Sequence, residues 1–177
     1  MLIERVQSLN HDQHFVDICG SRNITVRDCV SNNLQDTYGT ATFQIDRAKN
    51  LGIWGLLLDG TNPKNITLSN NRITSMSELV LQLGHDQSNV KGLKVVNNTI
   101  NCTNKTKGQI AIGNDEDTSI SKTDIIGNNI TLNNVNSAGI HLVSDPKKKF
   151  KDISISSNTI SGKMRAAIFM GSSIMPN

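Results

Sequence analysis

Two acidic residues, Asp17 and Asp46, belong to short segments in which apolar and polar residues alternate, FVDIC at 15–19 and TFQID at 42–46. Such alternation indicates β-strands. If the two strands stack, Asp46 lies one strand above and two residues beyond Asp17, and the carboxylates are roughly 6 to 9 Å apart. That separation suits an inverting glycosidase, in which water fits between acid and base. Asp17 and Asp46 are therefore candidate catalytic residues, with His14 as a candidate proton carrier. Chance placement of two acids on neighbouring strands is the alternative.

A second group of candidates lies on the outward positions of these and the equivalent later segments. Gln44, Gln82 and His141 could hydrogen-bond successive hydroxyl groups of a glycan, and a solvated sheet face is the alternative. Trp54, in the long interruption at 47–63, could stack on a sugar or anchor an interface. The full outward row is Asp17, Gln44, Gln82, Ala111, His141 and Phe169.

A third group consists of Asp86, Asp115 and Asp145, each of which follows an inward apolar residue by three positions. Carboxylates stacked about 5 Å apart repel one another unless a cation or solvent intervenes. This column raises the hypothesis of a Ca²⁺ site, and no other cofactor is expected. The alternative is that each Asp makes local side-chain-to-backbone bonds in a turn.

All three groups depend on a phrase that the chain repeats five times. In each copy two apolar or nearly apolar positions alternate, and a fixed column then follows, Cys29, Asn71, Asn98, Asn128 and Asn158. A turn Asn can adopt the left-handed conformation and hydrogen-bond its equivalent one coil away. Repetition at this period is typical of a solenoid. The copies are RNITVRDC at 22–29, KNITLSNN at 64–71, KGLKVVNN at 91–98, KTDIIGNN at 122–129 and KDISISSN at 151–158.

A second alternating segment follows each phrase, and no helical pattern is present. Short strands repeated without helices predict an all-β parallel β-helix of about five to six coils. Leucine-rich repeats are excluded because their consensus is absent. The inward columns predicted for the second segment are Phe43, Leu81, Ile110, Ile140 and Ile168, then Ile45, Leu83, Ile112, Leu142 and Met170.

Length, charge and composition limit the domain organisation and the partners that the chain can have. The 177 residues suit one β-helix domain, 1–177. Because the backbone groups of the terminal strands would be unpaired, we interpret this domain as a fragment or a subunit of a longer or oligomeric solenoid. The formal net charge of +3 is small and dispersed, so no nucleic-acid partner is expected. No segment has the length of a membrane span, and MLIERVQSLNHDQ lacks the apolar run of a signal peptide. Cys19 and Cys29 are expected to be small packed residues.

HFVDICGSRNITVRDCVSNN, TATFQID and LLLDGTNPKNITLSNNRI resemble the pectate-lyase-like, right-handed parallel β-helix family over residues 13–73. The resemblance is to bacterial and phage members with HxIDICGSKNVTIxNC, EAIQID and DGTPxKNVTIxNN phrases. It implies a single-stranded right-handed β-helix that acts as a polysaccharide lyase, hydrolase, epimerase or phage tail adhesin. This chain has Thr42 near the place where the family phrase has an acid. The D-D, G-H-G and R-I-K elements of polygalacturonases are absent, which excludes a pectin hydrolase.

Three functions follow as expectations. The first is a phage or prophage tail-associated β-helix, extracellular or virion-associated and homotrimeric, that binds cell-surface polysaccharide and could also degrade it. The second is a fragment of a bacterial polysaccharide lyase or hydrolase. The third is a structural adhesin stalk without catalysis. The residues leave enzyme status open.

Overall fold

This computed structural model describes residues 1–11, 13–34, 41–46, 62–85, 87–115, 118–143 and 150–171. The described residues form strands and connecting turns and include no helix. Accordingly, a search of these ranges finds no helix with the length and apolar character needed to cross a membrane. The all-β class predicted from the alternating segments is confirmed.

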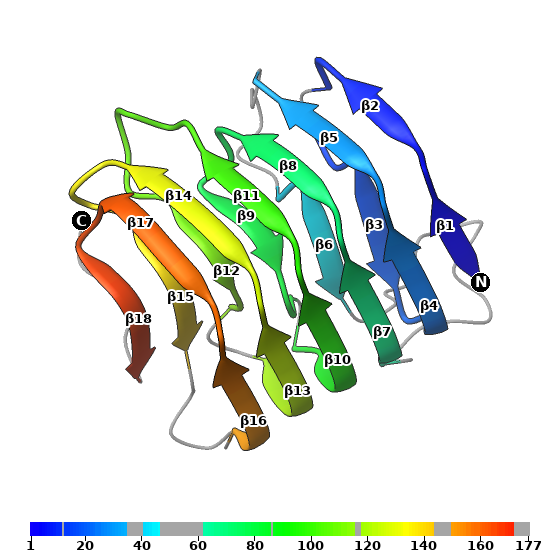
Figure 1. Ribbon diagram of the computed structural model, residues 1–177. Coiled ribbons are helices and arrows are strands. Elements are labelled where there is room, and N and C mark those ends of the chain that lie inside the picture. The colour runs from blue at the N-terminus through cyan, green and yellow to red at the C-terminus, as the bar shows by residue number, and fades with distance from the viewer. Residues whose placement is uncertain are drawn as a thin grey trace.

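The strands form three parallel six-stranded sheets that wrap around one axis, as Figure 1 shows. Each passage along the chain adds one strand to sheet A, then B, then C, which makes a right-handed parallel β-helix. Sheet A contains β1 (Leu2–Glu4), β4 (Arg22–Arg27), β7 (Lys64–Ser69), β10 (Asn89–Val96), β13 (Ser119–Ile126) and β16 (Lys151–Ser156). Sheet B contains β2 (Gln7–Leu9), β5 (Val30–Asn33), β8 (Arg72–Ser75), β11 (Thr99–Cys102), β14 (Asn129–Asn133) and β17 (Thr159–Lys163). Sheet C contains β3 (Val16–Cys19), β6 (Phe43–Asp46), β9 (Leu79–Gln82), β12 (Ile110–Gly113), β15 (Ala138–Val143) and β18 (Ala166–Gly171).

The register of sheet A matches the columns predicted from the repeated phrase. Ile66 pairs with Ile24 and Leu93, and Leu68 pairs with Val26 and Val95. These side chains point inward and are buried, so equivalent residues pack on one another from coil to coil. The β-branched and leucine side chains of the repeated phrase therefore form one wall of the core.

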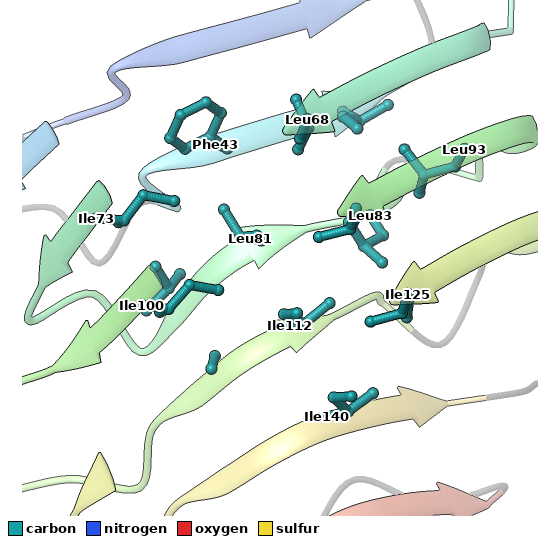
Figure 2. Close-up of a cluster of buried hydrophobic side chains, with 14 of the residues drawn as sticks. Phe43, Leu68, Ile73, Leu81, Leu83, Leu93, Ile100, Ile112, Ile125 and Ile140 are labelled. Carbon is teal, nitrogen blue, oxygen red and sulfur yellow. The ribbon is translucent and has the colours of Figure 1, made fainter. Parts of the chain in front are cut away.

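The register of sheet C differs from the prediction by two residues at β12. Ile112, not Ile110, pairs with both Leu81 and Ile140. Figure 2 shows Phe43, Leu81, Ile112 and Ile140 following one another across the strands. A shift of two residues keeps the same side chains inward, so the alternation of residue types could not detect it. As a consequence Gly113, not Ala111, occupies the outward row between Gln82 and His141.

The corner between sheets A and B is held by a ladder of asparagines, of which Asn71, Asn98 and Asn128 are buried and Asn158 is partly buried. The Oδ1 atom of Asn98 accepts the backbone N–H and the side-chain Nδ2–H of Asn71, both at 3.0 Å. The Oδ1 atom of Asn128 accepts the same two donors of Asn98, at 2.9 and 3.0 Å. The Nδ2 group of Asn98 also donates to Leu68 O at 2.9 Å. The ladder predicted from the Asn column is thus confirmed, and it satisfies polar groups that the corner removes from water.

The left-handed turn at this corner is made by the residue before each ladder position. The φ angles there lie between 55° and 69°, whereas the ladder asparagines are not left-handed. The expectation that the ladder Asn itself adopts the left-handed conformation is therefore wrong. Its side chain must point along the solenoid axis to reach the next coil, so the preceding residue makes the turn. These left-handed residues are Asp28, Asn70, Asn97, Gly127 and Ser157.

Candidate functional site

Three polar side chains meet where the strands of sheet C end. Gln82 is the last residue of β9, His85 lies in the turn that follows, and Asp115 lies in the turn after β12. The Nε2 group of Gln82 donates to Oδ1 of Asp115 at 3.0 Å, and Nδ1 of His85 is hydrogen-bonded to Oδ2 of the same carboxylate. We name this group the Gln82–Asp115–His85 cluster. It joins two coils, because Gly113 pairs with Gln82 and brings Asp115 beside the turn that carries His85.

The backbone around the cluster is tightly constrained. Asp115 N donates to Gly84 O at 3.1 Å, and His85 N donates to the hydroxyl oxygen of Ser88 at 3.0 Å. Gly84 has a φ of 156°, and a Cβ atom there would lie 3.1 Å from Cβ of Thr118. The turn after β9 therefore packs directly against the turn after β12, and this packing positions the imidazole relative to the carboxylate.

Asn114 secures the same region to the following coil. Its Nδ2 group donates to Val143 O at 2.8 Å, and its Oδ1 accepts from Val143 N at 3.0 Å. The same Nδ2 also donates to Asp115 O and to the hydroxyl oxygen of Thr118. Asn114 is only 5% exposed, so these bonds form in a site largely shielded from water. Asp115 is consequently held by bonds to both its side chain and its backbone.

The cluster is accessible to a ligand. The side chains of His85 and Asp115 are 38% and 35% exposed, whereas Gln82 as a whole is 8% exposed. A carboxylate bonded to a ring nitrogen orients the imidazole. The arrangement thus combines an orienting Gln, an anion and an imidazole at the surface, groups that can hydrogen-bond hydroxyls or exchange a proton.

Of the two predicted catalytic acids, Asp17 and Asp46, the structure describes the side chain of Asp17 only. Asp17 pairs with Gln44, and Asp46 pairs with Cys19, so the acids are offset by one coil and two residues as the sequence predicts. Asp17 is exposed and accepts a bond from Sγ of Cys19 at 3.3 Å. The side chain of Asp46 lies outside the described residues. The carboxylate separation therefore stays a prediction.

His14 lies at the other end of these strands. Its Nδ1 is hydrogen-bonded to Ala41 O, before β6 begins. Asp46, in contrast, is the last residue of β6, opposite Cys19. Five residues of extended chain separate the levels of His14 and Cys19, which is roughly 16 Å. The structure thus does not bring His14 together with Asp46.

The exposure of the side chains in the outward row of sheet C decreases from Asp17 to His141. Asp17 is exposed, Gln44 is partly exposed and His141 is 0% exposed. The imidazole of His141 packs edge-on against Phe169 with ring centroids 4.8 Å apart. A side chain that is fully covered offers no contact to a polysaccharide, so His141 does not contribute to an exposed binding surface. Trp54 lies outside the described residues.

The predicted cation column is likewise described at one position. Asp86 and Asp145 lie outside the described residues, and Asp115 belongs to the cluster with Gln82 and His85. Within the described ranges, no group of three or more His, Cys, Asp or Glu side chains could hold a metal ion. The Ca²⁺ hypothesis stays a prediction.

The sequence analysis placed Gln82 and Asp115 in separate groups, and His85 was not among its candidate residues. The signal that unites them is the pairing of Gly113 with Gln82, which the predicted register missed. No protein-family model, curated protein or solved structure matches this chain. The fold and the geometry of the cluster are therefore the basis for a functional proposal.

Proposed function

We propose that the chain binds a cell-surface polysaccharide at the edge of sheet C where the exposed side chains of His85 and Asp115 lie, as a phage or prophage tail-associated β-helix. The observation that carries this proposal is the Gln82–Asp115–His85 cluster, in which partly exposed polar groups are fixed by bonds between two coils. Fixed donors and acceptors bind sugar hydroxyls without a large loss of side-chain entropy. Asp17 and Gln44 extend the polar row to earlier coils, spaced about 4.8 Å apart.

The parallel β-solenoid also supports the finer assignment to the pectate-lyase-like family. The phrases that carry this resemblance fall on consecutive elements, from β3 through β8. Under this proposal the protein acts outside the cell or on the virion and forms a homotrimer. Light scattering tests the oligomer: three times the mass of 19.3 kDa is expected, and a monomer would contradict the trimer.

A second candidate function is polysaccharide cleavage by a lyase or hydrolase. The bond between His85 and Asp115 favours it, because a carboxylate that orients an imidazole is a common arrangement for proton transfer. In this role His85 carries the proton and Asp115 positions the ring. The alternative catalytic pair is Asp17 and Asp46, whose backbone offset fits the sequence prediction.

Binding is tested with an array of bacterial surface glycans and three variants. His85→Gln and Asp115→Asn keep side-chain size while changing the hydrogen bonds, and both are expected to weaken binding at least five-fold. Asn101→Ala, exposed on sheet B, is the matched control and should bind as wild type. A thermal melt of each variant shows whether it folds. Unchanged affinity in folded His85→Gln and Asp115→Asn would contradict the proposed site.

Cleavage is tested by the release of reducing sugar or unsaturated uronate from the glycans that bind. Activity lost in His85→Gln with retained binding would assign the proton transfer to His85. Activity lost in Asp17→Asn and Asp46→Asn, and retained in His85→Gln, would assign it to the acid pair. Binding without product release from any bound glycan would contradict the enzymatic candidate and leave the binding proposal intact.

A further inference from the structure

Basic side chains occupy one row across sheet A. The register pairs Arg22 with Lys64, and Lys64 with Lys91. Ser121 then pairs with both Lys91 and Lys151. The row therefore carries four basic residues at five successive levels. We name Arg22, Lys64, Lys91 and Lys151 the cationic row.

A left-handed residue follows each row position and keeps the basic side chains on the outer face. In β10, Val90 and Leu93 are both buried, whereas Lys91 between them is exposed. In a regular strand, side chains three positions apart point to opposite faces, so only one of Val90 and Leu93 would point inward. Gly92, with a φ of 75°, bends the backbone between them, and both side chains can therefore point inward. All four basic residues of the row are exposed. The residues at the left-handed position are Asn23, Asn65, Gly92, Lys122 and Asp152.

The cationic row concentrates positive charge that the sequence spreads over more than a hundred residues. Successive levels are about 4.8 Å apart, so the row spans roughly 19 Å, and each charge lies within a Debye length of the next. Among the described residues, none of the four basic groups of the row forms an ion pair. Stacked like charges repel one another, and an anionic ligand relieves that repulsion.

The surroundings of the row include both signs of charge. Lys122 follows Ser121 and adds a fifth positive charge at the level that lacks one. Asp152 adjoins Lys151, and Asp124 lies on the next outward row, where it pairs with Lys94. The negative groups nearest the row therefore lie at the end of the solenoid that contains β13 and β16, whereas Glu4 of β1 lies at the other end of its strand and pairs with Arg27. The row from Arg22 to Lys91 adjoins no acidic residue of sheet A on its own strands.

We propose that the cationic row binds a linear polysaccharide that carries repeated anionic groups and lies along the solenoid axis, across the strands of sheet A. The next outward row supplies Thr25, Thr67 and Ser154, whose hydroxyls can hydrogen-bond sugar hydroxyls. Single-stranded nucleic acid would need aromatic side chains for base stacking, and the strands of sheet A contain none. The chemistry thus favours an anionic glycan.

This site is separate from the Gln82–Asp115–His85 cluster. Figure 1 shows sheet A (β4, β7, β10, β13 and β16) and sheet C (β3, β6, β9, β12, β15 and β18) on different sides of the solenoid. The inference goes beyond the proposed function, because it assigns a second surface and the charge of its ligand. Either surface can fail its test without the other.

The experiment compares two triple variants of the full chain. The row variant is Lys64→Gln, Lys91→Gln and Lys151→Gln, and the control variant is Arg72→Gln, Lys105→Gln and Lys163→Gln. The control residues are also exposed, and each variant lowers the formal net charge from +3 to zero. A difference between the variants therefore reports the position of the charges and not their number.

The probes are alginate, which carries carboxylates, dextran sulfate, which carries sulfates, and neutral dextran, with oligo-dT as the nucleic-acid probe. Wild type and the control variant are expected to bind one or both anionic glycans, more weakly as salt rises, and not to bind dextran. The affinities for alginate and for dextran sulfate, compared with each other, show whether carboxylate or sulfate is the preferred anionic group. Each lost charge should cost roughly five-fold, so the row variant should bind about a hundred-fold more weakly.

Three results would overturn the proposal. The first is no binding of either anionic glycan by wild type at low salt. The second is equal affinity in the row and control variants. The third is tighter binding of oligo-dT than of both anionic glycans. Binding retained in His85→Gln and lost in the row variant would separate this site from the one proposed on sheet C.

Discussion

The Asn ladder gives the sharpest test of how the coils are held together. In Asn98→Ala, the backbone N–H of Asn71 loses its acceptor and Leu68 O loses the amide donor of Asn98. Asn71 keeps its own amide bond to Val26 O. Each of these two buried polar groups costs about 1 to 3 kcal/mol when it is left without a partner, so we expect a loss of about 2 to 6 kcal/mol in the free energy of unfolding. Asn101→Ala removes an exposed amide from the next strand and should cost less than about 0.5 kcal/mol.

Urea unfolding followed by circular dichroism measures this difference. With a slope of about 2 to 3 kcal/mol per molar, the midpoint of Asn98→Ala should fall by roughly 0.7 to 3 M. Because solenoids can unfold in parts, amide hydrogen exchange provides a second measurement, in which the Asn71 N–H should lose protection before amides two coils away. Equal midpoints for Asn98→Ala and Asn101→Ala, with unchanged exchange at Asn71, would refute the account of the ladder.

Further predictions concern the thiols, the glycines and the core. Burial raises the pKa of Cys102 to about 12, so iodoacetamide at pH 9 should alkylate Cys19 and leave Cys102 unmodified until the protein unfolds; labelling of native Cys102 would contradict its burial. Because Cys102 keeps its proton in the folded state, its contribution to stability is present below about pH 9 and is lost as pH rises toward 12. Gly162→Ala should destabilise more than Gly92→Ala, since the new Cβ would lie 1.9 Å from a backbone oxygen in the first case and 2.7 Å from a side-chain oxygen in the second; thermal melts in the reverse order would contradict this. Ile112→Ala should cost about 2 to 5 kcal/mol in urea unfolding, and a cost below 1 kcal/mol would argue against the core position assigned to it.

The five strands of sheet A from β4 to β16 could be predicted residue by residue, because two features fix their register, whereas β1 was not predicted. β-branched residues alternate in each copy, and the Asn that ends the copy marks one position without ambiguity. A one-residue error would have turned Ile66 and Leu68 outward, so the sequence pattern excludes it. The strands of sheet B, which follow the Asn corner, were not predicted, because the second segment identified in each repeat forms sheet C.

Sheet C could be predicted only in part, because no residue type marks its register. Ile110 and Ile112 both point inward, and the choice between them depends on the turn before β12. There Gln109, 1% exposed, donates to Ser75 O at 2.9 Å and Ser77 O at 2.8 Å. A buried side chain that bonds to backbone groups more than thirty residues earlier has no counterpart in a local pattern.

The two proposed functional surfaces could also be predicted only in part from the sequence. Asp115 was predicted to join a column of acids, but the shifted register places it beside Gln82 and His85. The basic residues were interpreted as dispersed because they lie far apart in the chain. The first position of the repeated phrase is nevertheless basic in every copy, and the register of sheet A shows that Arg22, Lys64 and Lys91 stack.

Disulfide trapping tests the stacking of successive coils in sheet A, on which the account of the solenoid and of the cationic row depends. In a Cys19→Ser background, Lys64→Cys combined with Lys91→Cys should cross-link rapidly on oxidation, because paired residues on neighbouring parallel strands are about 4.8 Å apart. Lys64→Cys combined with Lys94→Cys, offset by three residues or roughly 10 Å along the strand, should stay reduced. Cross-linking of the offset pair, or none in the paired positions, would contradict the register of sheet A and with it the cationic row.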